Sequence, residues 1–350
     1  MDTEVPSTNL PRASPTPTPG EPHIDNGPSQ GSAPWKTRLL TFAGTYGTVV
    51  VFALLFLGFA IAEPDFFLTR ANLTNVLNQA ALGAIIAGGL TVVLIVGEFD
   101  LSIGANASLA GVLIVGLLLD DLPVPLGLLL VVLVGGCVGL ANGLIVTRLG
   151  VNALIATLGT SSLVVGLNYA YSDGIPRSLS GTAADFSRLA LGRWAGVPYP
   201  VFIMAGVLII LWILIEKTDL GQRMQAVGGN PEAAALAGIS VSRTKTLAFM
   251  VAGLCAALTG ALLAARTGSG QIAAGNGYLL PSFAAAFLGS TALRDGEFHI
   301  VGTFIGVMTV AVGFNGLTII GVPSSVQFLF EGTLLVSAVA LSTVARRRAG

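Results

Sequence analysis

Long stretches without a charged side chain are the feature that most constrains how this chain can fold. Nine runs of 19 or more residues contain no Asp, Glu, Lys or Arg. They cover residues 39–62, 71–97, 101–119, 122–147, 149–172, 194–215, 246–265, 267–293 and 298–330. A helix needs about 20 apolar residues to cross the hydrocarbon core of a bilayer. The ninth run is too long for one crossing and Gly321-Val322-Pro323 divides it, so the sequence predicts ten transmembrane helices.

Charges and helix breakers set the limits of these spans. We expect them over residues 40–61, 76–96, 101–119, 123–146, 151–172, 198–216, 246–265, 274–293, 299–320 and 324–341. The fold class that follows is an all-α polytopic membrane protein with a membrane domain over residues 35–345. Residues 1–34 are rich in Pro, Ser, Thr and Gly and hold no apolar run, so we expect them to form a disordered tail.

Composition supports the membrane class and excludes others. Only 10% of the residues are charged, against about 25% in soluble domains. A net charge of −1 leaves no basic surface for nucleic acid. Cys137 and Cys255 lie singly in apolar runs, and neither His23 nor His299 has a metal-ligand spacing. We therefore expect no metal, and no cofactor bound by this chain.

The distribution of Lys and Arg predicts the orientation. With ten spans and a cytoplasmic N-terminus, twelve of the 17 basic residues fall on the cytoplasmic side and five on the outer side. This bias follows the positive-inside rule. The sequence therefore predicts a multi-pass protein of the inner membrane, in contact with its lipid and with both termini in the cytoplasm.

The polar stretch at residues 217–245 is the longest hydrophilic loop within the membrane domain, and we expect it on the cytoplasmic side. Asn230 is a good helix N-cap, and Pro231 suits the first helical position. Glu232 complements the helix dipole, and Gly238 can end the helix in the left-handed conformation. A helix this short is marginal in water without a packing partner. It either folds back onto its own subunit or docks into another protein, and helix physics alone does not decide between these.

Several motifs in sequence order carry a resemblance to a known family. Residues 228–239, "GGNPEAAALAGI", resemble the coupling segment of the ribose-type family of ABC sugar permeases. Residues 96–111, "VGEFDLSIGANASLAG", resemble the Gly-Gly-Ile-Asp-Leu-Ser-x-Gly motif of that family. Residues 151–167, "VNALIATLGTSSLVVGL", are similar to its run after the fourth span, and the match continues over roughly residues 70–341. The chain departs from the pattern at Glu98-Phe99, at residues 293–302, "LRDGEFHIVG", and at Glu331, where related sequences often carry Lys.

The resemblance implies a type II-like ABC importer permease. Such a permease works as two copies, here most simply a homodimer, with two ATP-hydrolysing subunits and an extracytoplasmic solute-binding protein. The coupling residues that it implies are Gly229, Asn230, Pro231, Glu232, Ala233, Ala234, Leu236 and Gly238. The chain has no G-x-x-x-x-G-K-[ST] loop for ATP phosphates, so ATP hydrolysis belongs to a partner and the chain is not expected to be an enzyme.

Asp100 and Glu98 lie between two apolar runs and allow two interpretations. In the first, Asp100 is in a solvated turn that begins the next helix. In the second, a broken helix directs its polar end into the translocation path, because irregular backbone at membrane depth must face protein or a cavity. Glu331 lies inside the last span, where a charge is costly unless it faces the bundle interior or water.

Uncharged polar side chains within the spans are the candidates for lining a solute path, because amides can hydrogen-bond sugar hydroxyls. They are Asn78, Gln79, Asn106, Asn168, Gln271, Asn276 and Asn315. The alternative for each is a hydrogen bond between helices. A possible internal repeat pairs Gly97-Glu98-Phe99 with Gly296-Glu297-Phe298, and Asn142-Gly143-Leu144 with Asn315-Gly316-Leu317.

The sequence thus predicts the permease subunit of an ATP-driven importer for a sugar or a similar small polar solute. One alternative is an ABC permease for nucleosides or amino acids. Another is a stand-alone secondary transporter driven by an ion gradient, which would use Asp100, Glu331 and Glu98. A membrane-embedded enzyme has no nucleophile–base or metal constellation to support it.

Overall fold

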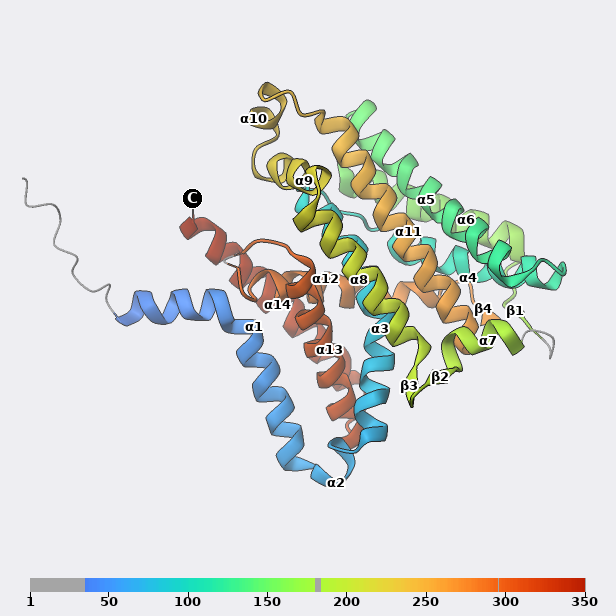
Figure 1. Ribbon diagram of the computed structural model, residues 1–350, viewed down its shortest axis with the longest axis horizontal. Helices are drawn as coiled ribbons and strands as arrows, with labels where there is room; N and C mark the ends of the chain where they lie inside the picture. Colours follow the sequence, from blue (N-terminus) through green and yellow to red (C-terminus); the bar gives the residue numbers. More distant parts are fainter. Residues whose placement is uncertain (1–34, 180–183, 295, 350) are drawn as a thin grey trace, which may run out of the picture.

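The computed structural model describes residues 35–179, 184–294 and 296–349, and within this part the fold is helical (Figure 1). The predicted disordered tail, residues 1–34, lies outside the described residues. Strands are limited to two antiparallel pairs of two residues each. β1 (Arg177–Ser178) pairs with β4 (Ser269–Gly270), and β2 (Arg193–Trp194) pairs with β3 (Val197–Pro198).

The helices follow the order of the predicted spans, with short elements between them. They are α1 (Trp35–Ala62), α2 (Pro64–Phe67), α3 (Arg70–Ile95), α4 (Ile103–Leu119), α5 (Val124–Arg148), α6 (Ala153–Ser172), α7 (Ala184–Leu191), α8 (Tyr199–Lys217), α9 (Asp219–Gly229), α10 (Pro231–Leu236), α11 (Val241–Thr267), the 3₁₀ helix η1 (Ala274–Tyr278), α12 (Leu279–Ser290), α13 (Ile300–Ile320) and α14 (Ser324–Ala349).

Among the described residues, six helices are long and apolar enough to cross a membrane: α3, α5, α6, α8, α11 and α13. Three shorter apolar helical stretches lie at residues 46–62, 103–119 and 324–340. The all-helical prediction is therefore confirmed. The eighth predicted range, 274–293, does not hold one continuous helix, because η1 occupies its beginning and α12 has only 12 residues. At about 1.5 Å per residue, α12 covers roughly 18 Å of a hydrocarbon core about 30 Å thick.

Contact with α4 explains the break before α12. The N–H of Gly275 donates to Ser108 Oγ over 2.9 Å. A Cβ at Gly275 would lie 2.2 Å from the carbonyl oxygen of Gly104, so only glycine permits this approach of the two backbones. The chain thus leaves its helical course at η1 to pack on α4.

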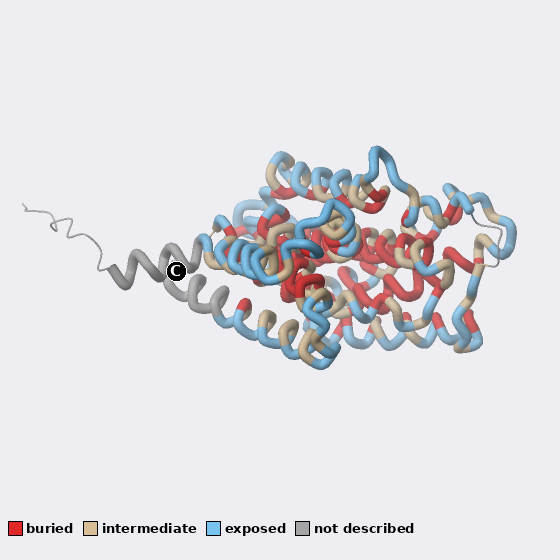
Figure 2. Tube along the Cα trace, turned by 90° about the horizontal axis from the view of Figure 1, so that it is seen from below, coloured by how far each residue is buried: buried red, intermediate tan, exposed pale blue. Residues whose placement is uncertain are grey.

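The core lies along α3, α11 and α13, and buried residues gather along the middle of the molecule (Figure 2). The most hydrophobic stretch of α3 is 83% buried, whereas that of α8 is 22% buried and faces outward. Small residues allow this packing, since apolar side chains gain little by leaving lipid for one another. A Cβ at Gly139 on α5 would lie 2.2 Å from the carbonyl oxygen of Phe249 on α11. This G-x-x-x-G segment therefore packs within one subunit.

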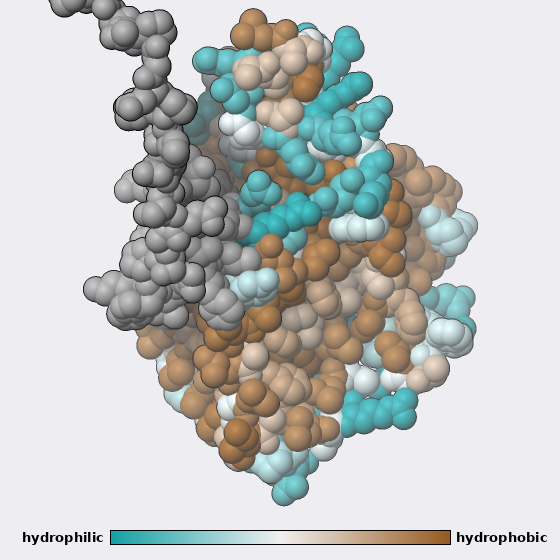
Figure 3. Space-filling model, turned by 60° about the vertical axis from the view of Figure 1, so that its left-hand side comes forward, coloured by the Kyte–Doolittle hydropathy of each residue, from teal (hydrophilic) through white to brown (hydrophobic). Residues whose placement is uncertain are grey.

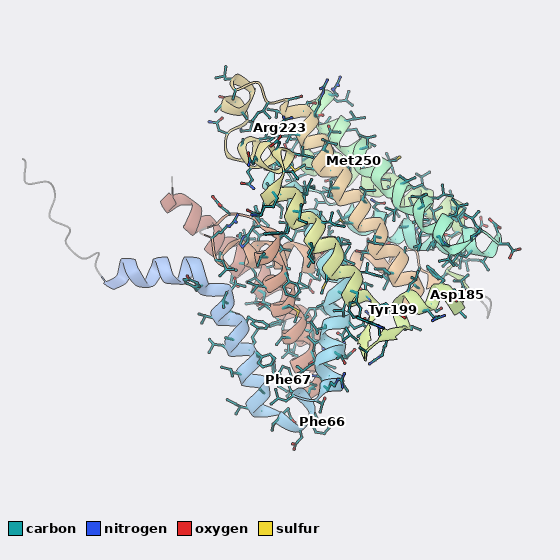
Figure 4. All side chains as sticks on the ribbon, viewed as in Figure 1. Phe66, Phe67, Asp185, Tyr199, Arg223 and Met250 are labelled. Carbon is teal, nitrogen blue, oxygen red and sulfur yellow. The ribbon has the colours of Figure 1, made fainter. Side chains whose placement is uncertain are left out.

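The loops divide between two opposite ends of the bundle. At one end, the turn after α3 meets α9 and α11, and α8 meets the loop before α13. At the other end, Arg70 Nη2 donates to the carbonyl oxygen of Ala195 over 3.4 Å, and β1 pairs with β4. Arg223 on α9 lies at the first end, and Asp185 and Tyr199 lie at the second (Figure 4). This division is the one that alternating passes through a membrane require.

One half of the possible internal repeat has a structural counterpart. Gly97 and Gly296 both have a positive φ, +81° and +80°, and each lies between a core helix and the helix after it. The second pair of motifs has no such counterpart. Asn142 lies on α5, the second helix after Gly97, whereas Asn315 lies on α13, the first helix after Gly296.

Candidate coupling site and solute path

Residues 217–245, the predicted coupling loop, form two helices at one end of the bundle and the first residues of α11 (Figure 1). The sequence reasoning did not predict α9. Its inner face is formed by Gly221, Met224 and Val227, which recur every three residues and are buried. This spacing is the signal that would have revealed an amphipathic helix packed on the bundle end.

Asn230 separates α9 from α10 and caps the second helix. Its Oδ1 accepts hydrogen bonds from the N–H groups of Glu232 and Ala233, each at 3.0 Å. Gly238 ends α10 with φ +82°, and the N–H of Ile239 donates to the carbonyl oxygen of Ala234. The predicted N-cap and left-handed C-terminus are both confirmed.

One side chain of α10 is buried and the others are exposed. Ala234 is 5% exposed and belongs to the main core cluster, so a large residue there would disturb the packing of α10 itself. Leu236, by contrast, is 91% exposed. The other predicted coupling residues are exposed as well: Gly229, Pro231, Glu232, Ala233 and Gly238. Hydrophilic residues gather at this upper end of the molecule, above a broadly hydrophobic middle (Figure 3).

A groove lies at this end of the bundle, between α9 and the beginning of α11. Its volume is about 820 Å³, and Arg223, Arg243 and Asp219 line it together with the chain after α10. A groove bounded by two helices and edged with charge can receive a helix or loop of a partner protein.

The turn before α4 holds Asp100 in a buried hydrogen-bond network. Asp100 Oδ1 accepts from the N–H of Ser102 over 2.8 Å and from Ser102 Oγ over 2.6 Å. Asn142 Nδ2 on α5 donates to Ser102 Oγ over 2.7 Å. Burial raises the pKa of the Asp100 carboxyl above its ordinary value, although hydrogen bonds from Ser102 and Asn142 oppose that shift.

Asp100 thus lies in the turn that precedes α4, as the first interpretation expected, but the solvation that it assumed is wrong. The N-cap residue of α4 is Ser102, which makes no side-chain capping hydrogen bond. The carboxylate is buried, because the turn is enclosed by neighbouring helices such as α5.

Two ion pairs connect this end of the bundle across helices that are distant in the sequence. Lys245 Nζ on α11 meets Glu98 Oε1 in the turn after α3, and both side chains are largely buried. Arg294 Nη1, in the loop before α13, lies 2.9 Å from Glu216 Oε1 at the end of α8. Lys245 and Glu216 bracket the coupling segment on its two sides. The two ion pairs therefore link the helices on either side of α9 and α10 to the turn after α3 and to the loop before α13.

His299 lies in the loop directly before α13. Its Nδ1 is 3.1 Å from the carbonyl oxygen of Glu297, which indicates that Nδ1 carries the proton. Burial lowers the pKa of the imidazole, while Glu297 and Glu216 oppose that shift and Arg294 adds to it. Burial therefore favours the neutral form of His299 over its charged form.

Three of the predicted path residues take part in hydrogen bonds between segments. Asn106 Nδ2 donates to the carbonyl oxygens of Gly135 and Gly253, and Asn168 Nδ2 donates to that of Ile272. Asn315 and Asn72 exchange two hydrogen bonds of 2.8 and 3.0 Å. The Nδ2 groups of Asn106 and Asn168 thus hold helices and loops together, and both amide atoms of Asn315 are used in the same way. Oδ1 of Asn106 and Oδ1 of Asn168 are buried and have no hydrogen-bond partner among the described residues.

The other four path residues lie toward the end of the bundle opposite to α10. Gln271 and Asn276 are exposed in the connection between α11 and α12, and Asn78 is half-buried on α3. Gln79 lines a cavity between α3, α12 and α13. The structure therefore does not bring the seven residues together at one place. Glu331 is half-buried on α14, and none of the described residues forms an ion pair or hydrogen bond with it.

Comparison with known proteins assigns this arrangement to a family. Residues 72–339 match the model of the family described as the branched-chain amino acid transport system / permease component. The chain belongs to this permease family. Family membership confirms the resemblance inferred from the sequence. A permease component is a transport subunit that crosses the membrane several times. The prediction that the chain is not itself an enzyme is therefore also confirmed.

The permease is similar over most of its length to several import permeases. It is 37% identical over 304 residues to the ribose import permease protein of Bacillus subtilis (strain 168), covering 87% of this chain and 92% of the relative. It is 33% identical over 314 residues to the D-allose transport system permease protein of Escherichia coli (strain K12), covering 89% and 96%. It is 34% identical over 294 residues to the L-arabinose transport system permease protein of the same strain, covering 84% and 89%. No solved structure matches the chain.

Proposed function

We propose that the protein is the permease subunit of an ATP-binding cassette importer that carries a monosaccharide across the inner membrane. Similarity to permeases named for ribose, D-allose and L-arabinose, each over most of both chains, is the observation that carries this proposal. These three solutes share small size, neutrality and several hydroxyl groups. The proposal therefore names the chemical class, and a panel of sugars is needed to find the member.

Membership of the family implies that an ATP-hydrolysing subunit and a solute-binding protein act with the permease. The absence of a phosphate-binding G-x-x-x-x-G-K-[ST] loop from the full sequence agrees with this division of labour. We assign no cofactor to this chain. The proposal further includes a second copy of the permease and a surrounding of membrane lipid, and in it the end that carries α9 and α10 faces the cytoplasm with both termini.

In this proposal α10 and the groove beneath it are the surface that the ATP-hydrolysing subunit contacts. Leu236 is exposed, Asn230 caps the N-terminal end of α10, and Gly238 ends the helix in the left-handed conformation. These features support the role, because they present a short rigid helix to a partner. Binding of nucleotide moves the partner, and the two ion pairs transmit that movement from α8 and α11 to α3 and α13. A partner drives the change only if it binds the two states of the permease with different affinity.

Co-expression tests the proposal at the level of both partner and solute. The permease, with a tag on it alone, is expected to co-purify with the ATP-hydrolysing subunit and to take up one sugar of a panel of pentoses and hexoses. Uptake of a nucleoside or an amino acid, with no sugar transported, would replace the proposed solute class. A permease that purifies alone and transports without the ATP-hydrolysing subunit would contradict the proposal as a whole.

A further inference from the structure

A cavity lies between α3, α12 and α13, away from α9 and α10. Its volume is about 210 Å³. It is lined by Gln79, Ala80, Gly83, Arg266, Gly277, Tyr278, Pro281, Ser282, Ala285, Val307, Val310, Ala311 and Phe314. Most of these side chains are apolar or aromatic and a few are polar, which is the usual composition of a small-molecule site. The volume is below the roughly 300–1,000 Å³ of drug-sized pockets and thus suits a small solute.

Ser282 is the observation that indicates a ligand. It lines this cavity on α12, is only 2% exposed, and its Oγ has no hydrogen-bond partner. A buried hydroxyl without a partner is unfavourable, so such groups normally bind protein, water or a ligand. Here the cavity is the space from which that partner can come.

The neighbouring side chains add the chemistry for a hydroxylated solute. Arg266 lies at the end of α11, and no carboxylate among the described residues forms an ion pair with it. The amide of Gln79 and the phenol of Tyr278 can each donate and accept hydrogen bonds. The rings of Tyr278 and Phe314 offer apolar faces for the C–H side of a sugar ring.

The position of the cavity suits a path that is open on one side and closed on the other. Gln79, Arg266 and Tyr278 lie near the end of the bundle where β1 pairs with β4. Towards the other end, a Cβ at Gly306 on α13 would lie 2.0 Å from the carbonyl oxygen of Ala285 on α12. Further on, Thr91 Oγ1 and Thr303 Oγ1 are 2.7 Å apart and join α3 to α13. Close helix contacts therefore separate the cavity from α9 and α10.

We propose that this cavity is a monosaccharide subsite of the permease, in which Ser282 Oγ, Gln79 and Arg266 bind sugar hydroxyls on the outward-facing side. The inference rests on the proposed function and deepens it. It places a specific contact for the solute in the permease itself, on the short helix α12. The break at η1 is what brings the beginning of α12 to this cavity.

Cysteine labelling of the reconstituted importer tests the subsite. Cys137 is exposed and is first replaced by Ser, whereas Cys255 is buried. In this background Ser282→Cys changes one atom, and Ala284→Cys is the matched control, because Ala284 lies on the same helix, is buried and does not line the cavity. A small hydrophilic thiol reagent is applied to vesicles that contain the full importer.

We expect Ser282→Cys to react at least tenfold faster than Ala284→Cys. The sugar that the importer transports is expected to slow this reaction at least threefold at millimolar concentration, and a sugar that is not transported is expected to leave it unchanged. Equal reaction rates for the two variants would show that lipid or a second copy fills the cavity, and would overturn the subsite. Fast labelling that the transported sugar does not slow would overturn it as well.

Uptake by the parent importer in the same vesicles reports on the proposed function separately. Sugar uptake by the parent together with unprotected Ser282→Cys would refute the subsite alone. Failure of the parent to transport any sugar of the panel would refute the proposed function, and the subsite with it. As a second variant, Ser282→Leu is expected to lower sugar uptake at least tenfold while ATP hydrolysis by the complex continues. Normal uptake by a correctly inserted Ser282→Leu would contradict the subsite.

Discussion

Lys245 Nζ lies 2.5 Å from Glu98 Oε1, and this ion pair joins the beginning of α11 to the turn between α3 and α4. The two side chains are 18% and 17% exposed, so the pair is only weakly screened by solvent. α11 begins a few residues after α10, whereas α3 runs through the centre of the core. The contact therefore connects the beginning of α11, next to the exposed α10, to the most buried of the six long apolar helices among the described residues.

Reversal of this ion pair tests its role in coupling. Glu98→Gln and Lys245→Met are each expected to reduce sugar uptake per ATP hydrolysed, because each leaves a partly buried charge without its partner. The double variant Glu98→Lys with Lys245→Glu is expected to recover part of the uptake. The coupling free energy between the two positions is expected to be about 0.5–3 kcal/mol in a double-mutant cycle of melting temperatures. Additive effects of the single changes on stability would show that the two side chains do not interact. Such a result would contradict a role of the pair in transmitting movement.

Leu236 provides a test of the docking surface. Leu236→Asp is expected to weaken association with the ATP-hydrolysing subunit at least tenfold, since a charge replaces the most exposed apolar side chain of α10 at the proposed contact. Ile175→Asp is the matched control, because Ile175 is also an exposed apolar residue but lies at the opposite end of the bundle. Co-purification with the tagged permease measures both. Equal retention of the partner by the two variants would remove α10 from the interface.

His299 predicts a dependence of stability on pH. Its folded-state pKa lies below the unfolded value of about 6.5, because burial disfavours the charged ring. The unfolded state therefore binds the proton more strongly, and the stabilisation that the neutral ring permits is complete above pH 6.5. It is lost progressively as the pH falls below 6.5 towards the folded pKa. The melting temperature in detergent is expected to fall between pH 7 and pH 5, and His299→Asn is expected to flatten that decline. An unchanged pH profile in His299→Asn would contradict this account.

Glycine packing between α5 and α11 predicts that two Gly→Ala substitutions change the stability of the permease in different ways. Gly139→Ala is expected to destabilise the permease by about 1–3 kcal/mol, because its Cβ would overlap the carbonyl oxygen of Phe249. Gly159→Ala, on the outer surface of α6, has open space around its Cβ and is expected to be neutral or to stabilise by up to about 1 kcal/mol. Melting temperatures of the two purified variants measure the difference. The same effect at both positions would show that α5 does not pack closely on α11.

An all-helical membrane fold, with helices in the order of the charge-free runs, could be predicted from the sequence, because the spacing of charges reports directly on bilayer thickness. The number of helices could not, since α9 and the division of residues 274–293 into η1 and α12 were not predicted. The end caps of α10 were equally readable, since Asn230, Pro231 and Gly238 each act through local backbone chemistry. Contacts between residues that are distant in the sequence could not be predicted. Nothing in the order of residues shows that Glu98 meets Lys245, or that Gly275 approaches Gly104 and thereby shortens α12.

The solute path was the least predictable part of the site. Polarity within an apolar run marks a residue that needs a hydrogen bond, but it does not distinguish a helix partner from a ligand. The amide of Asn315 found partners on another helix, and so did the Nδ2 group of Asn106, whereas the hydroxyl of Ser282, which was not among the candidates, has none among the described residues. The difference depends on which atoms surround each side chain in three dimensions.

Uptake of the transported sugar into proteoliposomes is the most direct test of the central claim that this permease is driven by ATP hydrolysis on a partner. The vesicles contain the permease, the ATP-hydrolysing subunit and the solute-binding protein, with ATP supplied on the side of α9 and α10. We predict accumulation that requires ATP, is blocked by vanadate and is unaffected when ionophores collapse the ion gradients. Accumulation by the permease alone in response to a proton or sodium gradient would contradict the account.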